Sequence, residues 1–324
     1  MPLSDLALTE LEGFRPVRTE PDDFDAFWTR TLTEAAAHPL DPTFTPEAGP
    51  LTAVAVHDVS FAGYAGQRVH AWLVLPAHRD GPLPCVVEFP GYGGGRGLPH
   101  EQLLYAAAGF AHLVVDVRGQ GSVWRSGGTG DDAPAGGGPT HPGFMTRGIT
   151  DPDLYFYRRV FVDAVRAVAT ARSHPAVDPT RIAMVGESQG GGIALAMSGL
   201  IPDLTAVVAE VPFLCHFRRG AEIAATGPFG ELTRYLAAHR DHVDAAFRTL
   251  GYFDAVNHVA RATAPALFSV ALMDTTCPPS TVFAAYNHYP AAKRMEVYPF
   301  NGHEGGGAFQ DGLRLSWLRT ALRA

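Results

Sequence analysis

The chain has 324 residues, of which 46% are hydrophobic and 18% are charged, enough apolar material for a large buried core. Its formal net charge of -8 disfavours binding to nucleic acid or to an anionic membrane surface, and we expect neither as a partner. The single lysine, Lys293, leaves no Gly-Lys-Ser/Thr loop for a nucleotide. The three cysteines are widely spaced and form no CxxC pair, so we expect neither a zinc ribbon nor a disulfide framework.

The chain start and the cysteine count bear on location. Residues 1–12 are polar and acidic, without the basic start and apolar core of a signal peptide. No apolar run is long enough to span a bilayer. An odd number of thiols suits a reducing compartment. These features predict a soluble, cytoplasmic protein.

The N-terminal part is predicted to form an arm and then a hairpin. Residues 22–37 read as a helix, because four large apolar side chains share one face. The Pro-rich stretch 39–50 ends this helix, and we expect residues 1–50 to pack as an arm on the main domain. Stretches 54–61 and 68–75 alternate between apolar and polar residues like the two strands of an antiparallel hairpin.

Strands and helices alternate along the rest of the chain. Continuous apolar runs, typical of strands buried on both faces of a parallel sheet, occupy residues 85–89, 112–117, 182–185, 206–211, 266–272 and 295–298. Helical stretches lie between them, at residues 101–108, 155–172, 190–200, 280–289 and 309–322. This alternation predicts an α/β protein with a mostly parallel, doubly wound sheet. An antiparallel hairpin followed by parallel strand–helix units is the order of elements in the α/β-hydrolase fold.

Two segments interrupt the alternation. Residues 119–148 are rich in glycine and show no periodicity, as expected of a functional or mobile loop without an element of its own. Residues 213–259 are mostly helical and stand between two strands, so we interpret them as a cap inserted above the strand ends. The whole chain, 1–324, is predicted to form a single domain.

A candidate nucleophile follows one of the apolar runs. The sequence Gly186-Glu187-Ser188-Gln189-Gly190 fits Gly-x-Ser-x-Gly, with a short strand before it and a small-residue helix start after it. This strand–turn–helix context is typical of a nucleophile elbow, and the helix N-terminus favours developing negative charge. The alternatives are a Gly-rich turn with an incidental serine, or a dinucleotide loop, whose Gly-x-Gly-x-x-Gly pattern is not supplied here.

A base and an acid are expected later in the chain, in the order Ser, Asp or Glu, His. His303 stands in a glycine-rich loop after the last strand, and Asp274 stands just past the preceding strand. Asp274 could instead cap the following helix. Asp254, in the cap, is a weaker rival, and Glu304 is too close to His303 in the chain to reach the far ring nitrogen. An aspartate in this position would fix the imidazole tautomer.

Two histidines in the cap have a spacing that a metal site could use. His239 and His242, at i and i+3, have no evident third ligand, so a solvated helix is the favoured interpretation and we expect no metal or other cofactor. The oxyanion hole is predicted from two backbone donors. These are the N–H of Gln189, after the nucleophile, and that of Tyr92, in the loop Pro90-Gly91-Tyr92-Gly93.

Three motifs taken together resemble the signature of carbohydrate esterase family 7, which comprises acetyl xylan esterases and cephalosporin C deacetylases. The motifs are Arg118-Gly119-Gln120, Gly186-x-Ser188-Gln189-Gly190-Gly191 and His303-Glu304, in this order. The likeness covers nearly the whole chain and extends to residues 23–28, 90–92, 211–215 and 274–279.

The resemblance implies removal of acetyl groups from short acetylated xylo-oligosaccharides or from the cephalosporin nucleus, without a metal, in a homo-hexamer with an internal cavity. It places the triad on Ser188, Asp274 and His303 and the oxyanion donors on Tyr92 and Gln189. It also implies an acyl pocket and a set of structural residues. The pocket would consist of Tyr92, Phe213 and Pro228, and the structural residues would be Arg118, Gly119, Gln120 and Glu304. The Gly-rich stretch 127–138 is expected to affect the alcohol side of the substrate.

Rival interpretations remain within the same fold or outside catalysis. One is another short-chain esterase, a dienelactone hydrolase or a peptidase of the prolyl oligopeptidase type. Dienelactone hydrolases use cysteine where Ser188 stands, and such peptidases usually carry a propeller domain, for which this chain has no room. The other is a non-catalytic binding protein of the hydrolase fold, which would require a broken triad.

Overall fold

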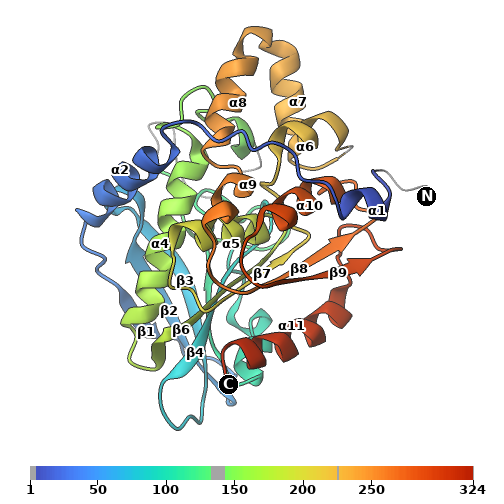
Figure 1. The fold of residues 1–324 in the computed structure, drawn as a ribbon. Helices are drawn as coiled ribbons and strands as arrows, with labels where there is room; N and C mark the ends of the chain where they lie inside the picture. Colours follow the sequence, from blue (N-terminus) through green and yellow to red (C-terminus); the bar gives the residue numbers. More distant parts are fainter. Residues whose placement is uncertain (1–4, 133–142, 225, 324) are drawn as a thin grey trace.

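The computed structural model describes residues 5–132, 143–224 and 226–323. They form a nine-stranded sheet with helices on both of its faces (Figure 1). The strand order is β1-β2-β3-β5-β4-β6-β7-β8-β9. The first three pairings, as far as β3 with β5, are antiparallel, and every later pairing is parallel. This confirms the predicted mostly parallel sheet with an antiparallel start.

Most strands agree with the predicted runs to within two residues; β6 begins five residues earlier than its run, and β1 was not predicted. In chain order they are β1 (Thr43–Pro46), β2 (Val54–Ala62), β3 (Arg68–Pro76), β4 (Leu83–Phe89), β5 (Ala111–Val115), β6 (Val177–Glu187), β7 (Ala206–Glu210), β8 (Ala266–Ala271) and β9 (Lys293–Tyr298). In β6, Ile182 and Met184 face one buried cluster, while Ala183 and Val185 face another. A strand covered on both sides needs apolar residues at successive positions, which is why these runs do not alternate.

Two layers of helices cover the sheet. The helices α4 (Phe156–Ser173), α5 (Gln189–Leu200) and α10 (Pro279–His288) pack on one face, joined by α2 (Phe24–Ala36). The short α3 (Leu104–Ala107) and the long α11 (Gly307–Ala321) pack on the other face. Among the helices of the described residues, none has both the length and the apolarity needed to cross a membrane.

The segment between β7 and β8 is helical, as the cap hypothesis expected. It contains α6 (Phe217–Ile223), α7 (Phe229–Ala238), α8 (Val243–Gly251) and α9 (Ala255–His258). The first three rise above the sheet at the top of the molecule (Figure 1). Pro228, the residue before α7, lines the same cavity as Ser188, so the cap reaches the carboxyl end of β6.

Several local predictions were wrong. The Pro-rich stretch contains β1, which pairs with β2 at the sheet edge, where prolines are tolerated because one side of the strand has no partner. The short helix α1 (Leu8–Leu11) was not predicted. The helix expected over 101–108 is only α3, because the backbone at Gln102 leaves the helical region. The glycine-rich loop contains a 3-10 turn, Phe144–Thr146, and residues 133–142 of that loop lie outside the described residues.

Candidate active site

Ser188 lies at a sharp turn between β6 and α5. Its backbone angles, φ 54° and ψ −117°, belong to a region that residues with a side chain rarely adopt. A Cβ on Gly186 would lie 2.1 Å from the carbonyl carbon of Gly190, and one on Gly190 would lie 1.9 Å from the carbonyl oxygen of Phe89. Glycine is therefore required at both positions for strand and helix to approach so closely.

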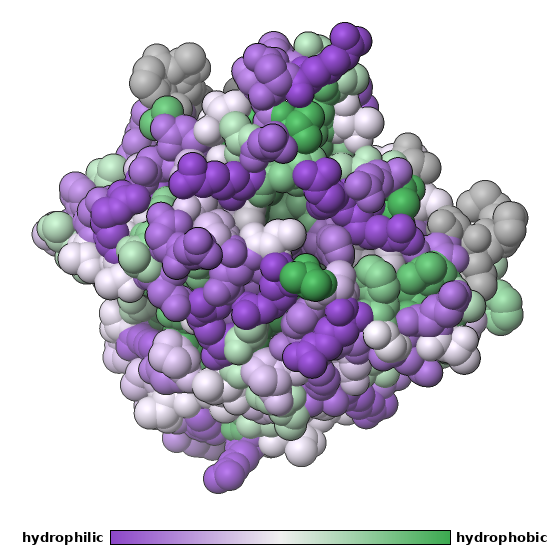
Figure 2. Space-filling model, turned by 45° about the horizontal axis from the view of Figure 1, so that its top comes forward, coloured by the Kyte–Doolittle hydropathy of each residue, from purple (hydrophilic) through white to green (hydrophobic). Residues whose placement is uncertain are grey.

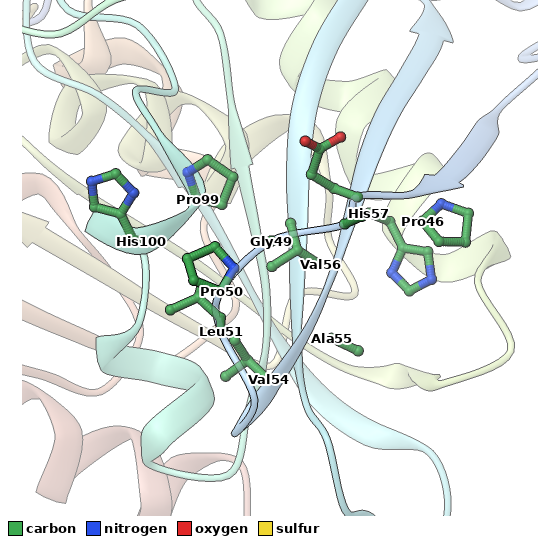
Figure 3. Close-up of a pocket in the computed structure, with 12 residues that line it drawn as sticks. Pro46, Gly49, Pro50, Leu51, Val54, Ala55, Val56, His57, Pro99 and His100 are labelled. Atoms are coloured by element: carbon green, nitrogen blue, oxygen red, sulfur yellow. The ribbon is translucent and has the colours of Figure 1, made fainter.

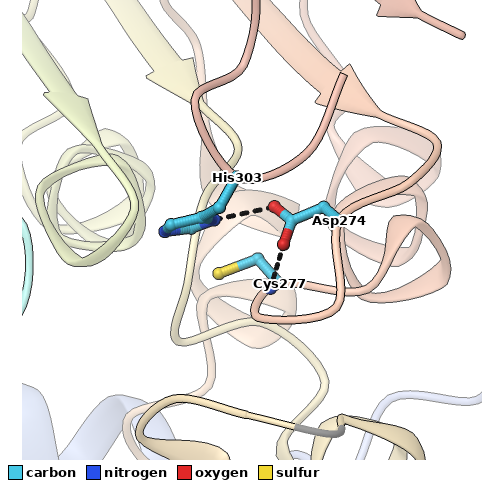
Figure 4. Close-up of side chains that lie close together, drawn as sticks. All are labelled: Asp274, Cys277 and His303. Atoms are coloured by element: carbon cyan, nitrogen blue, oxygen red, sulfur yellow. Dashed lines mark hydrogen bonds and ion pairs between the residues drawn. The ribbon is translucent and has the colours of Figure 1, made fainter. Parts of the chain in front are cut away.

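His303 and Asp274 meet Ser188 from the ends of two other strands. The ring Nε2 of His303 lies 3.0 Å from Ser188 Oγ, and Nδ1 lies 2.7 Å from Asp274 Oδ2. Asp274 is fully buried, and its other oxygen accepts the backbone N–H groups of Thr276 and Cys277 at 2.7 and 2.9 Å. Figure 4 shows the carboxylate between the ring and the Cys277 backbone. Of the two alternatives weighed for Asp274, the structure supports the pairing with histidine: α10 begins at Pro279 without a side-chain cap, and the N–H groups that Asp274 accepts belong to the turn before it.

The electrostatics of His303 follow from this arrangement. Burial alone disfavours the charged ring, but the hydrogen bond and the charge of Asp274, with smaller effects of Glu187 and Glu304, outweigh it. The pKa of His303 is consequently raised above its ordinary value. The ring can hold a proton taken from Ser188, as a general base must.

Cys277 completes the only group of three possible metal ligands found among the described residues, with Asp274 and His303. Its thiol is buried, and burial raises the pKa of that thiol well above its usual range. A thiolate ligand is therefore disfavoured, and the His303 Nδ1 and both Asp274 oxygens are already hydrogen-bonded. We assign no metal to this group.

The loop after β4 is held against the elbow by paired side-chain amides. Gln120 and Gln189 exchange two hydrogen bonds, at 2.8 and 3.1 Å. The Gln120 carbonyl also accepts the Gly93 N–H at 2.7 Å. Gln189 is the first residue of α5, so its backbone N–H has no partner within the helix. The Tyr92 N–H donates to no protein acceptor in the described part of the chain. Both predicted oxyanion donors are thus unengaged beside Ser188.

Tyr92 connects this loop to the cap. Its hydroxyl lies 2.9 Å from both carboxylate oxygens of Glu231, in α7, and accepts the Phe144 N–H at 3.0 Å. The ring packs edge-on against Phe213, with centroids 6.3 Å apart. Burial and the charge of Glu231 raise the pKa of Tyr92, so the hydroxyl stays protonated and donates. Glu231 was not predicted as a site residue, because nothing in the sequence of its helix, α7, indicates a contact with Tyr92.

Arg118 is buried and binds three segments together. It donates to both oxygens of Asp163 in α4, at 2.6 and 2.8 Å, and to Gln67 in the β2–β3 turn. It also reaches Asp131 in the glycine-rich loop at 3.4 Å. Gly119 follows with φ +69°. These contacts agree with the structural role that the resemblance implied for Arg118. Glu304, in contrast, is exposed and accepts a hydrogen bond from Asn301.

A cavity of about 440 Å³ opens at Ser188 and His303. Tyr92 and Pro228 line it, as expected of an acyl pocket, but Phe213 is fully buried behind Tyr92. The remaining lining residues are Gly91, Trp124, Glu187, Gly227 and Thr276. Trp124, from the glycine-rich loop, was not predicted. Its indole N–H donates to the Tyr92 carbonyl at 2.9 Å, a contact that no local sequence pattern reveals.

Other candidates lie away from this cavity. A second cavity, of about 470 Å³, is formed mainly by residues 46–57 with Pro99 and His100 (Figure 3), and it contains no member of the triad. Asp254 caps α9 and also accepts the backbone N–H groups of His216 and Phe217, and its hydrogen bonds within the described part of the chain do not include His303. The rings of His239 and His242 stack in parallel, with their centroids 5.0 Å apart, and the Nδ1 of His242 forms a hydrogen bond with the Tyr235 hydroxyl.

The sheet order and the elbow define the class of this protein, an α/β-hydrolase fold. The model of the acetyl xylan esterase (AXE1) family matches residues 1–321. The chain therefore belongs to the acetyl xylan esterase family, a family of carboxylic ester hydrolases, which confirms the resemblance found in its motifs.

Individual relatives agree with this assignment. An acetyl xylan esterase from Paenibacillus is 38% identical, with a TM-score of 0.89 over 97% of this chain and 99% of that one. The acetyl xylan esterase 1 of Thermoanaerobacterium is 34% identical, with a TM-score of 0.88 over 98% and 99%. An acetyl esterase of Xylanibacter ruminicola is 28% identical over 296 residues, 90% of this chain. The chain spans 65% of the length of that curated relative.

Proposed function

We propose that this protein is a serine esterase that removes acetyl groups from small acetylated substrates, above all short acetylated sugars. The observation that carries the proposal is the unbroken series of contacts Ser188–His303–Asp274, at 3.0 and 2.7 Å, at the wall of a cavity. Serine needs a base to become nucleophilic near neutral pH, and here an oriented imidazole lies within reach of its hydroxyl. A non-catalytic hydrolase fold would not require this geometry.

The reaction proceeds in two acyl-transfer steps. Ser188 Oγ attacks the ester carbonyl carbon as His303 takes the hydroxyl proton, and the carbonyl oxygen becomes an oxyanion facing the N–H groups of Tyr92 and Gln189. The carbon–oxygen bond to the alcohol then breaks, and His303 returns the proton to the leaving alcohol. Water, deprotonated by the same ring, then attacks the acyl carbon; the bond to Ser188 Oγ breaks, acetate leaves, and His303 returns the proton to Ser188. Asp274 keeps the ring in the required tautomer.

The acyl group is expected to be short. Tyr92 forms one wall of the cavity, and three contacts, to Glu231, Phe144 and Phe213, hold its side chain in place. Pro228 closes the wall from the cap side. Because these groups are fixed by packing and hydrogen bonds, a long acyl chain would have to displace buried side chains. A cephalosporin acetate is the alternative substrate that the family resemblance implies.

Turnover of p-nitrophenyl acetate and of the octanoate ester tests the proposal. The wild-type protein should hydrolyse the acetate rapidly and the octanoate little, and Ser188→Ala should lose nearly all activity. Ser316→Ala, which removes an exposed hydroxyl in α11, is the matched control and should behave as wild type. A metal chelator should have no effect.

Two results would contradict different parts of the proposal. Parental acetate turnover in a folded Ser188→Ala variant would exclude the serine mechanism. Equal turnover of acetate and octanoate would exclude the short acyl pocket alone. The homo-hexamer and the cytoplasmic location stay predictions of the sequence and the resemblance.

A further inference from the structure

One carboxylate in the cavity has no assigned role. Glu187, the last residue of β6, precedes Ser188 and lines the cavity with His303 and Trp124. Its side chain is exposed, and within the described residues it has no hydrogen-bond or ion-pair partner. The other acidic groups of the site are engaged: Asp274 holds His303, and Glu231 holds Tyr92.

The charge of Glu187 is not neutralised by the cavity wall. None of the described residues that line the cavity is lysine or arginine. The charged groups that act on Glu187 from neighbouring elements are Glu210 in β7, Glu88 in β4, Arg314 in α11 and His303. Arg314, the only permanent cation of these four, already pairs with Glu210 and Asp311. A ligand in the cavity therefore meets a carboxylate free to accept its hydrogen bonds.

Glu187 lies on the side that receives the alcohol half of an ester. The leaving alcohol must take its proton from His303, so it departs on the His303 side of Ser188. Glu187 interacts electrostatically with His303 and with groups on the sheet face that α11 covers. Tyr92, the expected acyl-side residue, packs instead against the buried cluster on the other face of the sheet and is hydrogen-bonded to the cap helix α7.

We propose that Glu187 is a specificity-determining residue that selects esters of neutral or cationic alcohols and rejects esters whose alcohol half carries a negative charge. This inference rests on the proposed esterase function and assigns it a substrate class. A carboxylate accepts hydrogen bonds from hydroxyl groups, as an acetylated sugar offers, and attracts a cation. It repels a carboxylate placed in the same cavity. Of the two substrate classes considered, neutral acetylated sugars fit this site, and anionic cephalosporin esters do not.

The structure also sets the condition for the test. Partial withdrawal from water at the cavity wall, with the charge of Glu210, raises the pKa of Glu187 to about 7. Measurements must therefore be made well above neutral pH, where the carboxylate is ionised. Below that range the discrimination should weaken, since a protonated Glu187 has no charge to repel an anion.

The experiment compares three acetate esters with similar phenolic leaving groups. They are 3-acetoxybenzoate (anionic), its methyl ester (neutral) and 3-acetoxyphenyltrimethylammonium (cationic). The kcat/KM of Glu187→Gln is divided by that of wild type for each ester, which cancels the intrinsic reactivity of the ester. The anionic ratio should rise about tenfold, the neutral ratio should stay near one, and the cationic ratio should fall by a similar factor. Glu222→Gln, an exposed charge in α6 outside the cavity, should leave all three ratios near one.

The outcomes separate this inference from the function on which it rests. If wild type hydrolyses the neutral ester but the three Glu187→Gln ratios change together, the specificity role is wrong and the esterase function stands. If wild type hydrolyses none of the esters, the proposed function itself fails. Equal charge effects in Glu222→Gln would show that net charge, not the position of Glu187, sets the preference.

Discussion

Three side chains of the site differ sharply in their access to water, and that difference suits their proposed roles. Asp274 is fully buried, Ser188 is nearly so, and the His303 side chain is about one-third exposed (32%). Two backbone N–H groups hold the buried carboxylate of Asp274 in place beside the ring. The more exposed ring can exchange protons with the alcohol and with water.

The pH dependence of activity should report His303. Only the neutral ring can accept the Ser188 proton, so kcat/KM for a neutral acetate ester should fall as pH decreases through the pKa of His303. Because that pKa is raised, the fall should begin at higher pH than for an unperturbed imidazole. Glu187→Gln removes one of the charges that raise it, so the acidic limb should move to lower pH.

A pH–rate profile of wild type and Glu187→Gln measures this shift. Glu222→Gln, which removes an equal charge outside the cavity, should leave the acidic part of the pH–rate profile unchanged. A limb that stays fixed or moves to higher pH in Glu187→Gln would refute the electrostatic coupling between the two side chains.

The elbow depends on two elements that approach more closely than any side chain allows. β6 and α5 meet at Gly186 and Gly190, and α5 also touches the carbonyl oxygen of Phe89 at the end of β4. The loop that carries Tyr92 begins immediately after that strand. A displacement at this junction therefore moves the nucleophile and the predicted oxyanion donor relative to each other.

Gly190→Ala should destabilise the fold and reduce activity together. Its Cβ would lie 1.9 Å from the Phe89 carbonyl oxygen, and the resulting backbone shift should cost about 1–3 kcal/mol. Urea unfolding and p-nitrophenyl acetate turnover measure the two effects. Gly312→Ala is the control, because that position in α11 has open space and alanine should stabilise the helix by about 0.5–1 kcal/mol. Parental stability in Gly190→Ala would contradict the close approach.

At the scale of the molecule, the functional loops are tied to the sheet by buried polar links rather than by regular pairing. Arg118 joins the β2–β3 turn, the glycine-rich loop and α4 through Gln67, Asp131 and Asp163. At the surface, the face shown in Figure 2 is largely hydrophilic, and its apolar residues form small separate patches. We therefore expect the buried contacts of Arg118, rather than contacts on this surface, to stabilise the positions of the loops.

Arg118→Met should destabilise the whole molecule. Removing the guanidinium leaves Asp163 buried without its ion-pair partner, which should cost about 3–5 kcal/mol of unfolding free energy. Arg30→Met, which removes an exposed pair with Asp153, should cost less than about 1 kcal/mol. Thermal and urea unfolding of both variants give the comparison. Equal, small losses would mean that Asp163 finds solvent or another donor when Arg118 is absent.

Much of this molecule can be predicted from the sequence, because its strongest signals are local. The apolar runs predicted the parallel strands, and the strand–turn–helix context of Gly186 to Gly190 predicted the elbow that carries Ser188. The positions of Asp274 and His303 after successive strands predicted their meeting, because parallel strands bring their carboxyl ends to one edge of the sheet. The edge strand β1 was missed, since a short Pro-containing segment becomes a strand only through a distant partner.

The sequence by itself determined the fold class, the family and the three residues that we propose for catalysis. Only the tertiary structure decided what surrounds them: Trp124 and Glu187 at the cavity wall, Glu231 on the Tyr92 hydroxyl, and Phe213 behind the pocket. The physical reason is the range of the interactions. Strand periodicity and turn sterics act between near neighbours, whereas Tyr92 and Glu231 are 139 positions apart and meet only when the cap folds over the sheet.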